Sequence, residues 1–163
     1  MHSRECSFHL PDPAATDTLG AALASALVPG LVITLEGDLG AGKTSLVRAM
    51  LRALGHAGPV KSPTYALVEL YKLSSLCFYH FDFYRFNDPE EFLDAGLQDY
   101  FRDDAVCCVE WTDKAAGLLP APDLVVRFAI GSGVRDVFLQ AQSARGEACL
   151  SRLVCPTLVP ASP

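Results

Sequence analysis

Long apolar segments and an excess of basic residues are both missing from this sequence. The most apolar early stretch, residues 21–28, stops at Pro29, well short of the ~20 residues that a membrane-spanning helix requires. Acidic residues outnumber basic ones by 19 to 13, which disfavours broad binding to nucleic-acid phosphates. We therefore expect a protein that neither spans a membrane nor binds nucleic acid over a wide surface.

We do not expect a secretion signal in the N-terminal region. The acidic residues Glu5, Asp12 and Asp17 precede the first apolar stretch, whereas a signal peptide begins with positive charge. The segment that follows the stretch is typical of a buried strand. A cytoplasmic location is therefore the expectation.

Six cysteines are present, but they lack the spacing of zinc ligands or of a disulfide framework. There is no C-x-x-C pair, and the four scattered histidines add no metal pattern. The neighbours Cys107 and Cys108 would point to opposite faces of a strand. A chain of this size does not need disulfides, so the cysteines are predicted to be small buried hydrophobic residues in a reducing compartment.

The sequence does contain enough apolar material for one compact core. It has 163 residues, of which 50% are hydrophobic and 20% charged, a length that suits one domain. No repeat, linker or low-complexity block interrupts it. We expect a single domain over residues 1–155 and a frayed tail over residues 156–163.

The order of apolar runs and helical patterns indicates an α/β fold. Short apolar runs predict strands at residues 31–36, 66–71, 76–82, 105–110, 124–130 and 134–141. Helices are predicted over residues 16–28 (capped by Thr16 or Asp17), over a segment ending at Gly55, from Pro89 onward, and over residues 147–153. Two hairpins are predicted, the second turning at residues 131–133, so the sheet should be mixed.

Residues 37–44 (GDLGAGKT) match the phosphate-binding loop G-x-x-x-x-G-K-[ST] at every fixed position. Backbone N–H groups and the start of the next helix would surround the phosphates. Lys43 would bridge the β- and γ-phosphates, and the Thr44 hydroxyl would bind magnesium. The motif predicts a three-layer P-loop NTPase-like fold. The residues expected to bind the nucleotide here are Asp38, Leu39, Gly40, Ala41, Gly42, Lys43, Thr44 and Ser45.

Two acids end apolar strands and are candidates for the carboxylates that such a site needs. Asp82 follows residues 76–81, and Glu110 follows residues 105–109. An acid at the end of a buried strand is costly unless it is paired or binds a metal. Each acid is equally compatible with an ordinary surface cap, and spacing alone does not decide which would bind magnesium.

Four ordered segments of the chain form a specific combination of motifs. They are LEGDLGAGKTSLVR (35–48), SPTY (62–65), HFDFYR (80–85) and VEWTDKA (109–115). Together they resemble one small family, the bacterial TsaE (YjeE) ATPase of tRNA threonylcarbamoyladenosine biosynthesis. A strand containing Arg135 after a glycine-rich turn also fits, and the resemblance covers residues 10–141.

The resemblance implies roles for four further residues. Thr64 resembles the family's switch threonine, which senses the γ-phosphate and magnesium. Asp82 is similar to the magnesium-associated acid, and Glu110 to the acid that positions or activates the attacking water. Trp111 is expected near the nucleotide, although a helix-start anchor packed on the sheet fits it equally well.

Four other positions in these motifs receive no chemical role. Tyr84 and Arg85 belong to HFDFYR, and Arg85 is also compatible with a simple ion pair. Asp113 stands where the family commonly has Glu, and Tyr65 where it commonly has Phe. Neither departure touches the residues of the phosphate loop.

The resemblance implies a cytoplasmic ATPase that uses ATP and Mg²⁺. It would drive or reset a threonylcarbamoyl transferase complex with subunits of the TsaD and TsaB type, reaching tRNA only through them. Residues 61–65 are expected to be ordered by the γ-phosphate and released on hydrolysis. Turnover of the isolated protein should be low, because charge neutralisation is incomplete without a partner.

Two other functions remain open from the sequence. One is a small-molecule kinase on a P-loop scaffold, although neither an Arg-rich lid nor a second anion-binding motif is evident. The other is a nucleotide-gated interaction module whose hydrolysis is incidental. A guanine-specific switch is disfavoured, because the single asparagine, Asn87, is followed by Asp88 and not by Lys.

Overall fold

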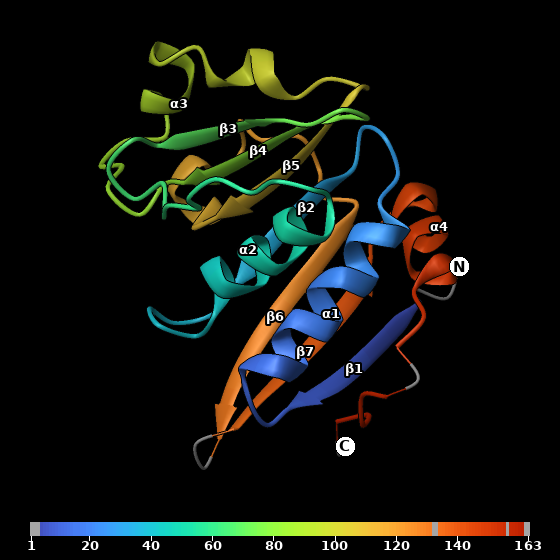
Figure 1. Cartoon of the computed structure of the whole chain (residues 1–163). Helices are drawn as coiled ribbons and strands as arrows, with labels where there is room; N and C mark the ends of the chain where they lie inside the picture. Colours follow the sequence, from blue (N-terminus) through green and yellow to red (C-terminus); the bar gives the residue numbers. More distant parts are fainter. Residues whose placement is uncertain (1–3, 132–133, 156, 162–163) are drawn as a thin grey trace.

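The computed structural model of the chain describes residues 4–131, 134–155 and 157–161. Its centre is a seven-stranded sheet of order β1-β7-β6-β2-β5-β4-β3 (Figure 1). Neighbours among β4, β5, β2 and β6 pair in parallel, whereas β3, β7 and β1 pair antiparallel, which confirms the mixed α/β sheet. The strands are β1 (Glu5–Leu10), β2 (Val32–Glu36), β3 (Val68–Lys72), β4 (Cys77–Asp82), β5 (Ala105–Glu110), β6 (Leu124–Gly131) and β7 (Val134–Ala141).

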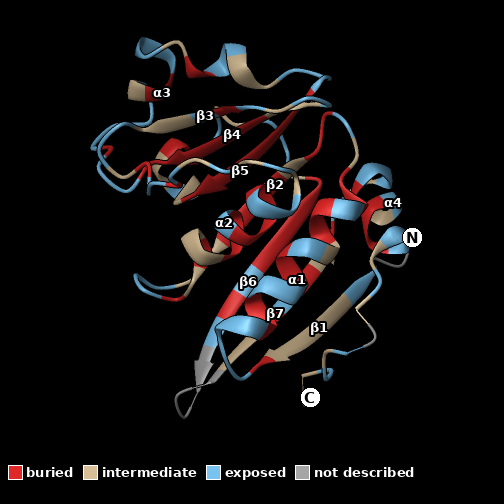
Figure 2. Cartoon of the chain, in the orientation of Figure 1, coloured by how far each residue is buried: buried red, intermediate tan, exposed pale blue. Residues whose placement is uncertain are grey.

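Helices cover the two faces of the sheet unequally. On one face α1, α2 and α4 bury a large aliphatic cluster, and Figure 2 shows buried residues along their inner sides. On the other face α3, η1 and η2 bury a smaller, aromatic cluster over β4 and β5. The helices are α1 (Pro13–Ala26), α2 (Lys43–Ala53), α3 (Glu91–Asp94) and α4 (Ala144–Arg152), with the 3₁₀ turns η1 (Leu97–Tyr100) and η2 (Thr112–Ala115).

The parallel strands define the edge of the sheet where a ligand can bind. The carboxyl ends of β2, β4 and β5 meet there, because β5 pairs in parallel with both of the others. Loops that leave these ends are the usual ligand-binding segments of α/β sheets. The phosphate loop follows β2, and the two candidate acids end β4 and β5.

Three helix starts differ from the sequence prediction. Helix α1 is capped by Asp12, whose side chain accepts a hydrogen bond from the N–H of Ala15, so the prediction of Thr16 or Asp17 was wrong. Helix α4 begins three residues early because Ser143 caps it through the N–H of Gly146. Pro89 lies in a turn before the four-residue α3, so it is not the first helical residue.

Strand β1 was missed by the prediction, and it changes the surroundings of the tail. Its residues pair with β7 from Glu5↔Gln140 to Leu10↔Arg135. On its other side, the N–H of His9 donates to the carbonyl of Val159 at 2.7 Å. The segment predicted to be frayed therefore contacts the sheet at this point. The division into one domain and a tail stays a prediction.

The turn predicted at residues 131–133 lies partly outside the described residues. The cysteines are free thiols, and Cys107 and Cys108 lie in the clusters on opposite faces of the sheet, as predicted. The prediction that all six are buried was wrong, because Cys6, Cys77 and Cys155 are only partly buried. Burial raises the pKa of Cys107 to about 12, so this thiol stays protonated.

Within the described part of the chain we find no cluster of three metal-ligating side chains and no helix long and apolar enough to cross a membrane.

Candidate functional site

The phosphate loop connects the carboxyl end of β2 to the amino end of α2, as the motif predicts. Gly42 is the N-cap of α2 and has a φ of 110°, a conformation that other residues rarely adopt. A Cβ at Gly42 would also lie 2.6 Å from Nη1 of Arg135. The positive φ is the constraint that favours glycine here, because the flexible end of Arg135 can shift away from a Cβ. The loop ends at a helix N-terminus whose free N–H groups can bind an anion.

A cavity of about 230 Å³ beside this loop brings most of the predicted site residues together. Asp38 and Ala41 do not line it: the Asp38 carbonyl accepts the Ala41 N–H at 3.0 Å within the loop, and the Ala41 side chain is buried. Trp111 instead lines an adjoining cavity that shares Lys43. The lining residues of the first cavity are Leu39, Gly40, Gly42, Lys43, Thr44, Ser45, Ser62, Thr64, Asp82, Glu110 and Arg135.

Lys43 is buried between the loop and the acid that ends β5. Its Nζ donates to the carbonyl of Gly37 at 2.6 Å and lies 3.6 Å from Oε1 of Glu110. The same ammonium lies 4.6 Å from the centre of the Trp111 ring, a cation–π contact. An anion in the cavity would compete with these contacts for the ammonium group.

Asp82 and Glu110 lie directly opposite each other at the ends of β4 and β5. Both are only 3% exposed, and both line the cavity with Lys43. Asp82 accepts the backbone N–H of Tyr84 at 2.9 Å and the hydroxyl of Thr64 at 3.1 Å. Residues from all four sequence motifs therefore meet at one cavity.

The carboxyl group of Asp82 is held in an environment that disfavours its charge. Burial raises its pKa above the usual 3.8, and the charge of Glu110 raises it further. The hydrogen bonds from Tyr84 and Thr64 act in the opposite direction but do not cancel the effect. A cation bound beside Asp82 would relieve this penalty.

We expect Asp82→Asn to stabilise the nucleotide-free protein at neutral pH, by about 0.5–2 kcal/mol. The folded protein binds the Asp82 proton more tightly than the unfolded chain does. The destabilisation caused by ionisation of Asp82 is absent below the usual pKa, grows as the pH rises to the raised pKa, and is fully present above it. Unfolding measured at neutral pH and near pH 4 should show the gain shrinking on acidification. Loss of stability at neutral pH would contradict this, and the exposed Asp99→Asn is the control.

Two residues at the site received no role from the sequence. His80 is fully buried on β4, and its Nε2 lies 2.6 Å from Oε2 of Glu110. The sequence could have indicated its place beside the site, because His80 precedes Asp82 by two residues and residues two apart on a strand share a face. Arg135 reaches the cavity from β7, and no local pattern around it indicates that approach.

The aromatic residues of the motifs lie next to residues that line the cavity. Trp111, in the left-handed conformation with a φ of 58°, is the N-cap of η2, as one interpretation predicts, and it also contacts Lys43. Its place near a nucleotide stays a prediction. Its ring lies 4.9 Å from that of Tyr84. Arg85 packs 4.0 Å above the Tyr65 ring and forms no ion pair among the described residues. Asp113 is exposed and lines only the adjoining cavities.

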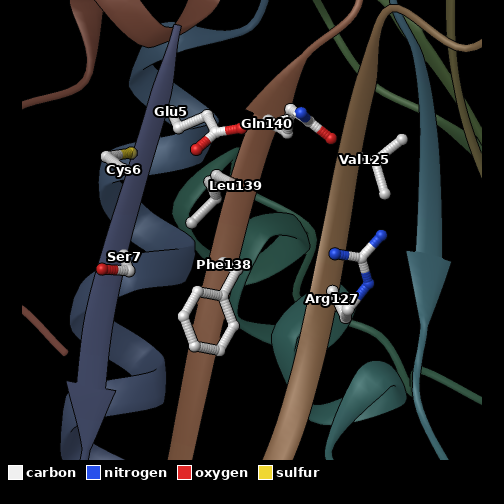
Figure 3. Close-up of a pocket in the computed structure, with 8 residues that line it drawn as sticks. All are labelled: Glu5, Cys6, Ser7, Val125, Arg127, Phe138, Leu139 and Gln140. Atoms are coloured by element: carbon white, nitrogen blue, oxygen red, sulfur yellow. Dashed lines mark hydrogen bonds between the residues drawn. The ribbon is translucent and has the colours of Figure 1, made fainter. Parts of the chain in front are cut away.

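A larger cavity of about 460 Å³ lies on the face of β1, β6 and β7 away from the helices (Figure 3). Three of its polar side chains are already paired: Gln140 donates to Glu5 at 2.8 Å, and Arg127 donates to Glu36 at 3.1 Å. No part of the phosphate loop lines it. The smaller cavity is therefore the candidate site.

Comparison with known proteins identifies the family of this chain. The model of the family "Threonylcarbamoyl adenosine biosynthesis protein TsaE" matches residues 10–137. The TsaE protein of Haemophilus influenzae is 46% identical to this chain, and the match covers 74% of this chain and 77% of that protein. The TsaE protein of Bacillus subtilis is 35% identical, and the match covers 88% of this chain and 90% of that protein. A crystal structure of B. subtilis YdiB superposes with a TM-score of 0.80 at 29% identity, covering 94% of this chain and 96% of that one. The chain therefore belongs to the TsaE family.

Proposed function

We propose that this protein is a P-loop ATPase required for the threonylcarbamoyladenosine modification of tRNA. The observation that carries the proposal is the meeting of the phosphate loop, Lys43 and the two buried acids at one cavity. The relatives from H. influenzae and B. subtilis carry the name of this tRNA modification, which supplies the process. A cytoplasmic location belongs to the proposal, because the substrate tRNA is found there.

Two side chains fit a magnesium ion bound with the nucleotide. The hydroxyl of Thr44 and the carboxylate of Asp82 both line the cavity, and Mg²⁺ prefers such oxygen donors. Two protein ligands are enough, since this ion usually keeps waters and phosphate oxygens as well. When bound, the cation would neutralise charge that develops on the phosphates.

Each of the remaining residues has a separate role in the proposed hydrolysis. The loop N–H groups and Lys43 hold the phosphates, and Thr64, already hydrogen-bonded to Asp82, orders residues 61–65 when a γ-phosphate is present. Glu110 accepts a proton from a water molecule while the oxygen of that water attacks the γ-phosphorus. The bond between the γ-phosphorus and the oxygen of the leaving ADP breaks. ADP and inorganic phosphate are the products.

Arg135 is proposed as an additional phosphate contact. Its guanidinium lies beside Gly42 and forms no ion pair among the described residues. Such a planar group can bind a phosphate with two hydrogen bonds. We expect Arg135→Ala to weaken Mg·ATP binding roughly 10-fold, measured by calorimetric titration. Arg102→Ala, which removes an exposed arginine, is the control. Unchanged affinity in Arg135→Ala would contradict the assignment.

Product analysis after incubation with Mg·ATP tests the proposed reaction. We expect ADP and inorganic phosphate, released slowly by the protein alone and faster with subunits of the TsaD and TsaB type. Transfer of phosphate to a small metabolite would favour the kinase alternative. If cells with a Lys43 variant lose the tRNA modification but cells with a Glu110 variant keep it, hydrolysis is incidental and the nucleotide-gated module is the better description.

A further inference from the structure

His80 is a buried polar residue that the proposed reaction does not yet use. Its side chain is completely buried on β4, and its Nε2 lies 2.6 Å from Oε2 of Glu110. An ionised carboxylate can only accept a hydrogen bond, so Nε2 must carry the proton. The other ring nitrogen, Nδ1, is buried without a partner among the described residues. Among the described residues, the hydrogen bond of the imidazole is therefore made with the proposed catalytic acid.

The two oxygens of Glu110 have different partners. Oε1 lies 3.6 Å from Nζ of Lys43, whereas Oε2 accepts the short hydrogen bond from His80. In the proposed reaction Lys43 moves to the phosphates, which frees Oε1. The contact with His80 does not depend on the nucleotide, because adjacent parallel strands fix it: Asp82 pairs with Glu110, and His80 lies two residues earlier on the same face.

We propose that His80 is a positioning residue that holds Glu110 in the orientation needed to accept a proton from the attacking water. This inference rests on the proposed function of Glu110. The Nε2–H group fixes Oε2, so that Oε1, once released by Lys43, points toward the cavity. A merely structural histidine would fill space in the core and would not need to donate from Nε2. The distinction can be tested because side-chain amides can replace either ring nitrogen separately.

Three variants of the full-length chain separate these roles. His80→Gln can place an amide N–H near the position of Nε2, His80→Asn places it near Nδ1, and His80→Leu provides similar bulk with no donor. We expect His80→Leu and His80→Asn to lower kcat roughly 10- to 100-fold with KM for Mg·ATP changed less than about threefold. His80→Gln should keep kcat within about fivefold of the wild type, because it restores the donor. Thermal unfolding of each variant shows whether the fold is intact.

The opposite results would overturn the inference. These are a wild-type kcat in His80→Leu, an equal loss in the Gln and Asn variants, or a change of KM as large as that of kcat. If His80→Leu does not fold, the difference in kcat between His80→Gln and His80→Asn tests the inference by itself. Both variants carry a polar amide, and only the position of the donor differs.

A spectroscopic measurement tests the contact without hydrolysis. Imidazole ¹⁵N resonances at one fixed neutral pH, with His80 assigned by its loss in His80→Gln, should show a protonated Nε2 whose proton shifts upfield in Glu110→Ala. An unprotonated Nε2, or no response to Glu110→Ala, would overturn the inference. If the wild type proves inactive toward ATP while this signal is present, the proposed function fails and the geometry of the pair stands.

Discussion

Replacement of Lys43 by alanine is expected to lower the affinity for ATP by roughly 10- to 100-fold, the loss of charge-assisted hydrogen bonds worth about 1.5–3 kcal/mol. Lys43 is the buried cation of the site, and its present partners, Gly37 and Glu110, are contacts that a phosphate would replace. Without the ammonium, the cavity holds two buried carboxylates that repel the triphosphate. Equilibrium titration with a fluorescent ATP analogue measures the effect.

The control for this prediction is Lys72→Ala, which removes an exposed lysine at the end of β3. It changes the net charge equally but lies outside the cavity, so it should leave the affinity unchanged. Wild-type affinity in Lys43→Ala would show that the nucleotide does not bind at the phosphate loop.

Replacement of Glu110 by glutamine should abolish most hydrolysis while ATP still binds. The amide keeps the size of the carboxylate and can still accept the hydrogen bond from His80, but it cannot accept a proton from water. Loss of a general base costs typically 10²–10⁴-fold in rate, and a loss of about that size is expected here. Removing the negative charge also frees Lys43 from its ion pair, so affinity should be retained or increased.

Phosphate release under single-turnover conditions, together with ATP titration, separates the two effects. Glu110→Ala should behave in the same way, and Glu90→Gln, an exposed acid before α3, is the control. Hydrolysis at the wild-type rate in both Glu110 variants would exclude this residue as the acid that activates water.

The centre of the site could be predicted from the sequence because its signals are local. The phosphate loop is one continuous motif between a strand and a helix. Asp82 and Glu110 each end an apolar strand, and a lone buried acid is unusual enough to be noticed. What the sequence could not supply is that β4 and β5 are neighbours, which places the two acids opposite each other.

The features that were missed depend on distant parts of the chain. Strand β1 is half-buried at the edge, and it becomes a strand by pairing with β7, more than a hundred residues away. Arg135 reaches the phosphate loop only because β7 returns beside β6. His80 was hidden within an apolar strand, although its spacing from Asp82 placed both on one face. The true cap of α1 lay four residues before Thr16, in the dipeptide Asp12-Pro13.

The most direct test of the central claim is the rate of ATP hydrolysis by the full-length protein, measured alone and with the TsaD- and TsaB-type subunits and tRNA. The cavity already contains a phosphate loop, a lysine and two acids, yet Leu39 in its lining is 66% exposed. We therefore expect positioning and charge neutralisation to be incomplete in the isolated chain. We predict slow release of phosphate by the protein alone, a clear increase with the complex, and loss of both in Glu110→Gln. A rate that does not change when the subunits and tRNA are added would contradict the account.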